Sequence, residues 1–252
     1  MNLVRSEWTK LRSVRSTWIA ALSAVAAGVA LSVLGASDML GASASDLPGD
    51  WDPTAQSLKG FLFAQLVIGM LGALSVTPEY STGLIGSSLV FVPSRSRLLA
   101  AKAAVVAGLT LAVSILTTML SFTVVQLMVR SADLPAAGLG DPGVVRALAG
   151  GTLYLTLVGL LGLAVGSLVR SATSSLAVLV GALLLVPALG PGLPGALGDW
   201  FGRFWPITAG QAAYTVVHVD GRTAPGAGLL ILAVAAAGIT VAAHLVFRRR
   251  DV

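Results

Sequence analysis

The chain contains no cysteine and little charge. Without cysteine it has no disulfide framework, no thiolate metal site and no cysteine nucleophile. Only 11% of its 252 residues are charged, against about 25% in ordinary soluble domains. The hydrophobic share is 56% and the mean hydropathy is +0.88. This composition predicts an all-α polytopic membrane protein with no room for a soluble catalytic domain.

Groups that do chemistry in other membrane proteins are also missing. The two histidines, His218 and His244, fall on opposite sides of the membrane in the topology given below, and the spans hold neither paired aspartates nor a His-Glu-x-x-His zinc motif. No span carries a charged residue near its centre, which disfavours a proton-coupled carrier. No Gly-x-x-x-x-Gly-Lys-Ser/Thr phosphate loop occurs, so any ATP is handled by another polypeptide. We expect no catalytic residue, no metal ligand and no bound cofactor in this chain.

Apolar segments long enough to cross a bilayer recur along the whole sequence. We predict a single transmembrane domain over residues 1–252, with six transmembrane helices at 18–40, 61–76, 98–129, 144–169, 174–189 and 228–247. The segment 98–129 exceeds the thickness of the hydrocarbon core and is expected to start in the cytoplasm. The first span is too long for a cleavable signal peptide and is expected to stay in the protein.

The basic residues define an orientation. Eleven of the 16 Lys and Arg fall on one side of these spans, namely Arg5, Lys10, Arg12, Arg15, Arg95, Arg97, Lys102, Arg170, Arg248, Arg249 and Arg250. Eight of the 11 acidic residues fall on the other side. The positive-inside rule then predicts that both termini are cytoplasmic. Basic residues at membrane edges explain the high pI without a nucleic-acid partner.

The segment before the first span, residues 2–16, predicts a helix lying on the membrane surface. Val4, Trp8, Leu11, Val14 and Trp18 recur at helical spacing between flanking basic residues. Glu7 falls inside this apolar arc unless Lys10, three residues on, pairs with it. The segment is either a topology signal alone or an elbow helix close to a cytoplasmic partner, with five candidate residues: Glu7, Trp8, Lys10, Leu11 and Arg12.

The connection after the second span predicts a short cytoplasmic helix. Thr77 suits the N-cap, Pro78 the first helical position and Glu79 the positive helix end, and the helix should finish before Pro93. These features are either helix-start chemistry and a topology signal, or a coupling segment over 78–97 that docks on a partner. The candidate coupling residues are Pro78, Glu79, Tyr80, Gly83, Arg95 and Arg97.

The connection before the last span, residues 190–227, predicts a re-entrant segment on the outer side. Large apolar side chains occupy one helical face over 195–205, and a second helix over 208–217 is expected to be capped by Thr208. The segment is either an aromatic-anchored loop or a lid over a transport path, formed by Leu197, Trp200, Phe201, Phe204 and Trp205.

Inside the spans, the predicted roles are structural. Gly159, Gly162 and Gly166 form a stripe of small residues that permits close helix packing. Gln65, Gln126 and Tyr154 are expected to form hydrogen bonds between helices rather than a ligand site.

Three motifs taken in order resemble one family. Ser6-Glu-Trp-Thr-Lys-Leu-Arg-Ser13, Pro78-Glu-Tyr-Ser-Thr-Gly83 and the Pro-interrupted outer helices are similar to ABC transporter permeases of the type-2 exporter class, in particular the short actinobacterial ones. The resemblance covers the whole chain in layout. Many relatives carry a basic residue after Glu-Tyr, where this chain has Ser81.

The resemblance implies a half-transporter in the cell membrane. Two permease chains, identical or similar, would form a twelve-span pore served by two separate ATP-binding subunits, which would hold ATP and Mg²⁺. Residues 2–16 would be the elbow helix, 78–92 the coupling helix with Glu79 as its polar contact, and 195–205 the outer re-entrant helix. The expected cargo is an amphipathic or lipophilic compound such as a drug, antibiotic, peptide or lipid. A non-transporting scaffold or sensor, and an ion-coupled secondary carrier, remain as alternatives.

Overall fold

The computed structural model describes residues 3–39, 41, 43, 45, 47–81, 95–217 and 221–249. Six helices in these ranges are long and apolar enough to cross a membrane, which confirms the predicted all-α fold with six spans. They are α2 (Arg15–Ser37), α4 (Phe61–Leu74) continued by α5 (Thr77–Ser81), α7 (Arg95–Ser131), α8 (Val144–Val169), α9 (Ala172–Val180) continued to η3 (Gly190–Gly192), and α13 (Pro225–Arg249). At 37 residues α7 is about 55 Å long, so it extends beyond a hydrocarbon core of about 30 Å.

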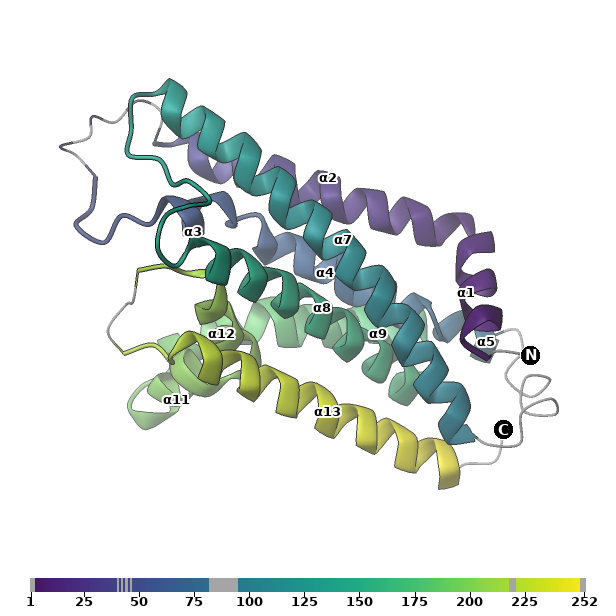
Figure 1. Ribbon diagram of the computed structural model, residues 1–252. Coiled ribbons are helices and arrows are strands. Elements are labelled where there is room, and N and C mark those ends of the chain that lie inside the picture. Colours follow the sequence, from purple (N-terminus) through teal and green to yellow (C-terminus); the bar gives the residue numbers. More distant parts are fainter. Residues whose placement is uncertain are drawn as a thin grey trace.

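The helix α8 forms the centre of the bundle. Of its most apolar window, 72% is buried within the chain, against 17% for the fifth and the sixth span. It lies between α7 and α13, with α4 and α9 behind it (Figure 1). The outer surfaces of the fifth and sixth spans are therefore left for lipid or for another chain.

The helices α4 and α8 meet along a line of glycines. A Cβ placed on Gly162 would collide with the main-chain carbonyl of Gly69, and one placed on Gly72 would collide with that of Gly159. Gly166 faces Ala73 in the same way. The predicted packing role of the glycine stripe is confirmed. The stripe packs against two glycines of α4, Gly69 and Gly72.

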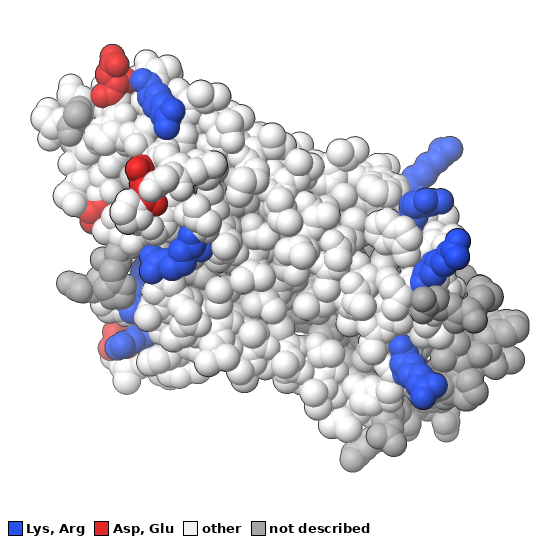
Figure 2. Space-filling view, viewed as in Figure 1, with Lys and Arg blue, Asp and Glu red and all other residues white. Residues whose placement is uncertain are grey.

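The two ends of the bundle differ in their elements and charge. The end that we call the α1 end holds α1 (Leu3–Ser13), α5 and the last turn of α13, and the opposite α11 end holds α3 (Pro53–Ser57), α11 (Ala196–Phe204), α12 (Pro206–Gln211) and η4 (Ala212–Tyr214) (Figure 1). On the face that Figure 2 shows, the charged side chains of the described residues lie at the two ends and none lies between them, with acidic residues visible only at the α11 end. This distribution is what a chain crossing a bilayer requires.

The fifth span contains a π-helical turn, η2 (Gly181–Leu185), before α10 (Val186–Leu189). Pro187 has no N–H to donate to the carbonyls of Leu183 and Ala182, four and five residues before it. Two side chains from other elements replace this donor: Gln65 Nε2 lies 3.1 Å from Leu183 O, and Trp205 Nε1 lies 2.9 Å from Ala182 O. The break is therefore satisfied by hydrogen bonds that join the fifth span to α4 and to the outer helices.

The polar side chains inside the bundle join helices, as predicted. The Tyr154 hydroxyl of α8 donates to Gln65 Oε1 of α4. Gln126 Nε2 donates to Pro53 O at 2.7 Å and to Ser57 Oγ at 2.8 Å, and its Oε1 accepts from Ala137 N at 2.7 Å. Because these groups satisfy one another, they stabilise packing rather than offering a ligand site.

Candidate functional site

The site begins with the amino-terminal helix α1, which is set at an angle to the first span (Figure 1). Val14 has extended backbone angles, φ −92° and ψ 116°, and separates α1 from α2. The Trp18 indole donates to Arg12 O at 3.0 Å and holds this bend. Trp8 is exposed, whereas Glu7 is 4% exposed and faces the bundle. A helix is therefore present where the sequence predicted one, with one carboxylate directed inward, and its position on the membrane surface stays a prediction.

Four charged side chains from three elements meet at the α1 end. Lys102 Nζ of α7 lies 2.6 Å from Glu7 Oε2 of α1 and 2.6 Å from Glu79 Oε1 of α5. Lys10 Nζ lies 2.8 Å from Glu7 Oε1 and 3.4 Å from Glu79 Oε1. We call Glu7, Lys10, Glu79 and Lys102 the charge cluster. With two carboxylates and two ammonium groups it is neutral as a whole.

Burial makes Lys102 the centre of this cluster. The side chains of Lys102 and Glu7 are each 5% exposed, that of Glu79 is 13% exposed, and that of Lys10 is 43% exposed. Each buried charge needs a partner, because a lone ion removed from water costs several kcal/mol. The predicted pairing of Glu7 with Lys10 is confirmed, but the buried partner is Lys102, which the sequence placed only among the topology-setting basic residues.

The electrostatics of the cluster favour the ionised forms. Burial alone would raise the pKa of the Glu7 carboxyl, but Lys102 and Lys10 outweigh it, so the pKa lies below its ordinary value. Burial alone would lower the pKa of Lys10, but Glu7 and Glu79 outweigh it and raise the pKa. At neutral pH these two groups are therefore charged and attract each other.

The short helix α5 is also fixed to the end of α8. The Tyr80 hydroxyl donates to Ser167 O at 3.4 Å, and the Arg170 guanidinium lies 4.9 Å from the centre of the Tyr80 ring. Arg170 ends α8 in the left-handed region, with φ 59°, and its N–H donates to Gly166 O. Neither contact was predicted, although a basic residue following the fourth span is visible in the sequence.

The described part of the predicted coupling segment is its beginning and its end. Residues 82–94, which include Gly83, lie outside the described residues, as does the side chain of Arg95. Arg97 is exposed in the first turn of α7. The predicted N-cap is wrong: α5 begins at Thr77 itself, and the Thr77 hydroxyl has no hydrogen-bond partner. The predicted docking contact of Glu79 stays a prediction, with its carboxylate placed against Lys10 and Lys102.

At the α11 end, the predicted aromatic helix is present as α11, which begins at Ala196 after Gly195. Trp200, Phe201 and Trp205 pack edge to face or tilted, with ring centres 5.1–6.4 Å apart. Leu197, Trp200 and Phe204 remain exposed, at 63%, 47% and 42%. This apolar face is not covered by the described part of the chain, so it faces lipid or another molecule.

The second outer helix differs from its prediction. It is α12, over Pro206–Gln211, and Pro206 rather than Thr208 starts it. The Thr208 hydroxyl lies inside the helix and has no hydrogen-bond partner. The physical reason is that proline suits the first helical position, where its missing N–H costs nothing.

The two ends of the bundle differ in the side chains that they bring together. No group of three or more His, Cys, Asp or Glu side chains that could hold a metal ion occurs among the described residues. The elements gathered at the α1 end instead connect an amino-terminal helix, a short helix after the second span and the long third span. Fold and site together define a multi-pass membrane protein in which ion pairs join α1, α5 and α7 at one end.

Comparison with known proteins identifies the family of this chain. The profile described as ABC-2 family transporter protein matches residues 3–188, which is most of the chain. The chain therefore belongs to the ABC-2 transporter family, whose members are the membrane permease components of ABC transporters. No curated protein matches the chain.

Proposed function

We propose that this chain is the membrane permease subunit of an ATP-driven exporter in the cell membrane. Separate ATP-binding subunits, two per transporter, bind ATP and Mg²⁺ and hydrolyse the ATP. The permease moves an amphipathic or lipophilic compound outward through a pore formed with a second permease chain. Family membership supports association with ATP-binding subunits.

The observation that carries the proposal is the charge cluster. A push on α5 reaches α1 through Glu79, Lys102 and Glu7, and it reaches α7 through Lys102 directly. Glu79 Oε2 is buried and accepts no hydrogen bond, so the cluster is not fully satisfied in this state. A network with one unsatisfied acceptor can gain a hydrogen bond when its helices shift, which suits a coupling element.

Charge supports the orientation in the proposal. The α1 end carries most of the basic residues, and the acidic residues outside the cluster lie mainly in the connections of the α11 end. The α1 end is then cytoplasmic, where ATP-binding subunits are found. The α11 helices would lie at the outer surface, where their apolar face can close the exit.

The second permease chain has a surface to occupy. The fifth and sixth spans are each 17% buried in their most apolar windows, so most of their surface is free to meet another chain or lipid. An identical or a similar chain packed there would complete a twelve-span assembly.

The test compares two matched arginine variants of the same helix after co-expression with candidate ATP-binding subunits. Arg97 and Arg130 are both exposed and lie at opposite ends of α7. We expect Arg97→Glu to reduce the amount of ATP-binding subunit that co-purifies with the permease, while Arg130→Glu leaves this amount unchanged. We also expect transport into inverted vesicles to need ATP. Glu79→Ala is less suitable, because the same carboxylate stabilises the charge cluster.

Two results would contradict the proposal. If no ATP-binding subunit is retained and transport in vesicles follows an ion gradient without nucleotide, the chain is a secondary carrier. If the ATPase is retained but no compound stimulates it or crosses the membrane, the chain is a scaffold.

A further inference from the structure

The end of the fifth span and α11 form a helical hairpin that packs mainly on itself. It comprises α10, η3 and α11, over residues 186–204, and we call it the outer hairpin. Apart from the adjoining η2, the main contacts of α10 and η3 are with each other and with α11. A Cβ placed on Gly198 would collide with Leu193 O, and one placed on Gly190 would collide with the Phe201 side chain, so the two arms pack closely. They therefore form one compact unit.

The outward surface of this hairpin is apolar and exposed. Leu189, Leu193 and Leu197 are 67%, 45% and 63% exposed. The fifth span as a whole is 17% buried in its most apolar window. No described element covers this side, so a movement of the hairpin there displaces no other part of the described chain.

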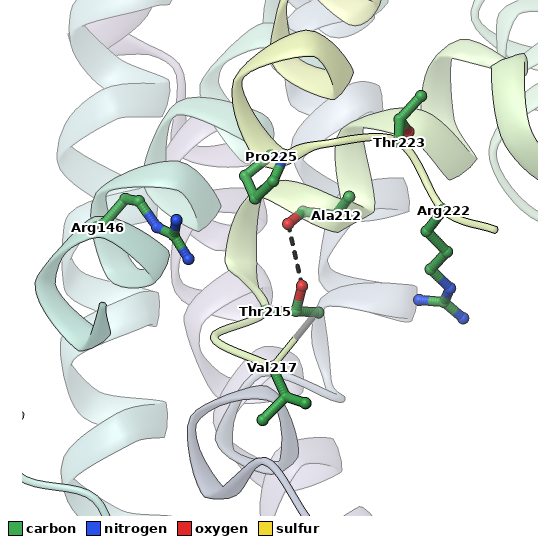
Figure 3. Close-up of a pocket in the computed structure, with 7 residues that line it drawn as sticks. All are labelled: Arg146, Ala212, Thr215, Val217, Arg222, Thr223 and Pro225. Atoms are coloured by element: carbon green, nitrogen blue, oxygen red, sulfur yellow. Dashed lines mark hydrogen bonds between the residues drawn. The ribbon is translucent and has the colours of Figure 1, made fainter. Parts of the chain in front are cut away.

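The helices before and after the hairpin are held by the bundle. The preceding helix α9 packs against α4 and α8, and the following helix α12 packs against α13. A Cβ placed on Gly228 of α13 would collide with Ala209 O of α12. Ala212, directly after α12, lines a small pocket together with Arg146 of α8 and Pro225 of α13 (Figure 3). The hairpin thus projects from two anchored elements.

The helical backbone is interrupted at both ends of the hairpin. Before it lies the π-helical turn η2, close to Pro187, which has no N–H to donate. After it, Trp205 has non-helical angles, φ −56° and ψ 129°, and separates α11 from α12. Prolines and π-helical turns are common causes of sharp helix bends. Two interruptions that flank one compact unit define a hinge.

One side chain joins the two interruptions. The Trp205 indole Nε1 donates to Ala182 O of η2 at 2.9 Å and so closes the base of the hairpin. One further side-chain hydrogen bond reaches the hairpin from another described element, from Thr223 Oγ1 to Arg203 O at 3.4 Å. The indole is therefore the main polar contact that fixes the angle between the hairpin and the bundle.

We propose that the outer hairpin rotates as one body about the axis through η2 and Trp205, with the Trp205 indole as the clasp that holds the present position. From Leu183 to Leu193 the arm is about 15 Å long at 1.5 Å per residue. A bend of about 20° then moves its tip by about 5 Å. The role of this movement in opening an exit rests on the proposed function, whereas the movement itself needs neither cargo nor ATP-binding subunit.

The test measures distances between spin labels by electron paramagnetic resonance on the purified full chain. Because the chain contains no cysteine, introduced cysteines are the only labelled sites. Leu197→Cys on α11 is paired with Val145→Cys on α8, both at exposed positions. We expect Trp205→Phe to broaden this distance distribution by about 5 Å relative to the unaltered clasp. Trp200→Phe, in the same aromatic cluster but without a bond to Ala182 O, should leave it unchanged.

Two further label pairs separate rotation of the hairpin from loss of structure. Leu127→Cys with Val145→Cys joins α7 to α8, and Leu189→Cys with Leu197→Cys lies within the hairpin, all at exposed positions. Both distributions should stay as narrow in Trp205→Phe as without it. Pro187→Ala returns an N–H to the interrupted helix and should narrow the distribution between α8 and α11.

Four results would overturn the inference. An unchanged distribution between α8 and α11 in Trp205→Phe excludes the clasp, and so does equal broadening in Trp200→Phe. Broadening of the α7 to α8 pair shows general loosening of the bundle, and broadening within the hairpin shows melting instead of rotation. Retention of an ATP-binding subunit affects none of these measurements, so the proposed function fails or stands separately.

Discussion

Replacing Lys102 by methionine tests the charge cluster most directly. The change keeps the length and bulk of the side chain but removes the ammonium group that lies 2.6 Å from both Glu7 and Glu79. Breaking a buried ion pair by removing one partner costs about 3–5 kcal/mol. Because Lys10 remains as a second partner for both carboxylates, we expect the low end, about 3 kcal/mol. The assay is denaturant unfolding of the purified protein in detergent.

A second substitution makes this prediction specific. In the double variant Lys102→Met, Glu7→Gln, the cluster keeps the neutral pair of Lys10 and Glu79, and neither buried site retains an unpaired charge. Buried ion pairs replaced by neutral groups are often tolerated without loss. The double variant should therefore be more stable than Lys102→Met alone, even though it carries one more substitution.

The control is Lys59→Met. Lys59 is exposed and makes one hydrogen bond, to Gly35 O at 3.2 Å, so its loss should cost only about 0.5–1 kcal/mol. The reasoning is refuted if Lys102→Met is no more harmful than Lys59→Met, or if Glu7→Gln adds its own full loss in the double variant.

Three further predictions concern the bundle and its pH response. Gly162→Ala should destabilise the protein by about 1–3 kcal/mol, because the added methyl group meets main-chain atoms, whereas Gly108→Ala, in open space, should not, as thermal unfolding can show. Trp205→Phe should cost about 1–3 kcal/mol by leaving a carbonyl of the fifth span unpaired, and Trp200→Phe less, measured in the same way. Since the pKa of Glu7 is lowered in the folded state, its stabilisation is present above the unfolded pKa of about 4.3 and is lost as pH falls through the folded value; Glu7→Gln should lack this acid loss in a pH series of unfolding temperatures.

The fold followed from the sequence because its main signal is local. Each span is a run of apolar residues long enough to be recognised without knowing its neighbours, and six of them are present. The glycine stripe on α8 could be read as a packing surface for the same reason. Its partners, Gly69 and Gly72 on α4, could not be assigned, because small residues are abundant and nothing in their spacing identifies which helix faces which.

The centre of the site was missed because it depends on distant residues. Lys102 follows Arg95 and Arg97 closely, so it looked like one more basic residue at a membrane edge. Its burial arises from Glu7, 95 positions earlier, which the sequence could pair only with Lys10. A lone lysine among alanines, valines and leucines, seven residues into a helix, was the available signal.

The break in the fifth span was also missed, although Pro187 marks it. A proline inside an apolar run predicts a kink and a loss of one main-chain N–H donor, which other groups must replace. The identity of those donors, Gln65 and Trp205, could not be predicted, since they come from elements 118 and 23 positions away.

The glycine contact between α4 and α8 has a consequence for movement. Where two backbones touch with no side chain between them, the helices pack over a large, closely fitting area, so we expect the second and fourth spans to move together as one block. A change of conformation in the bundle would then be a displacement of the other spans relative to α4 and α8.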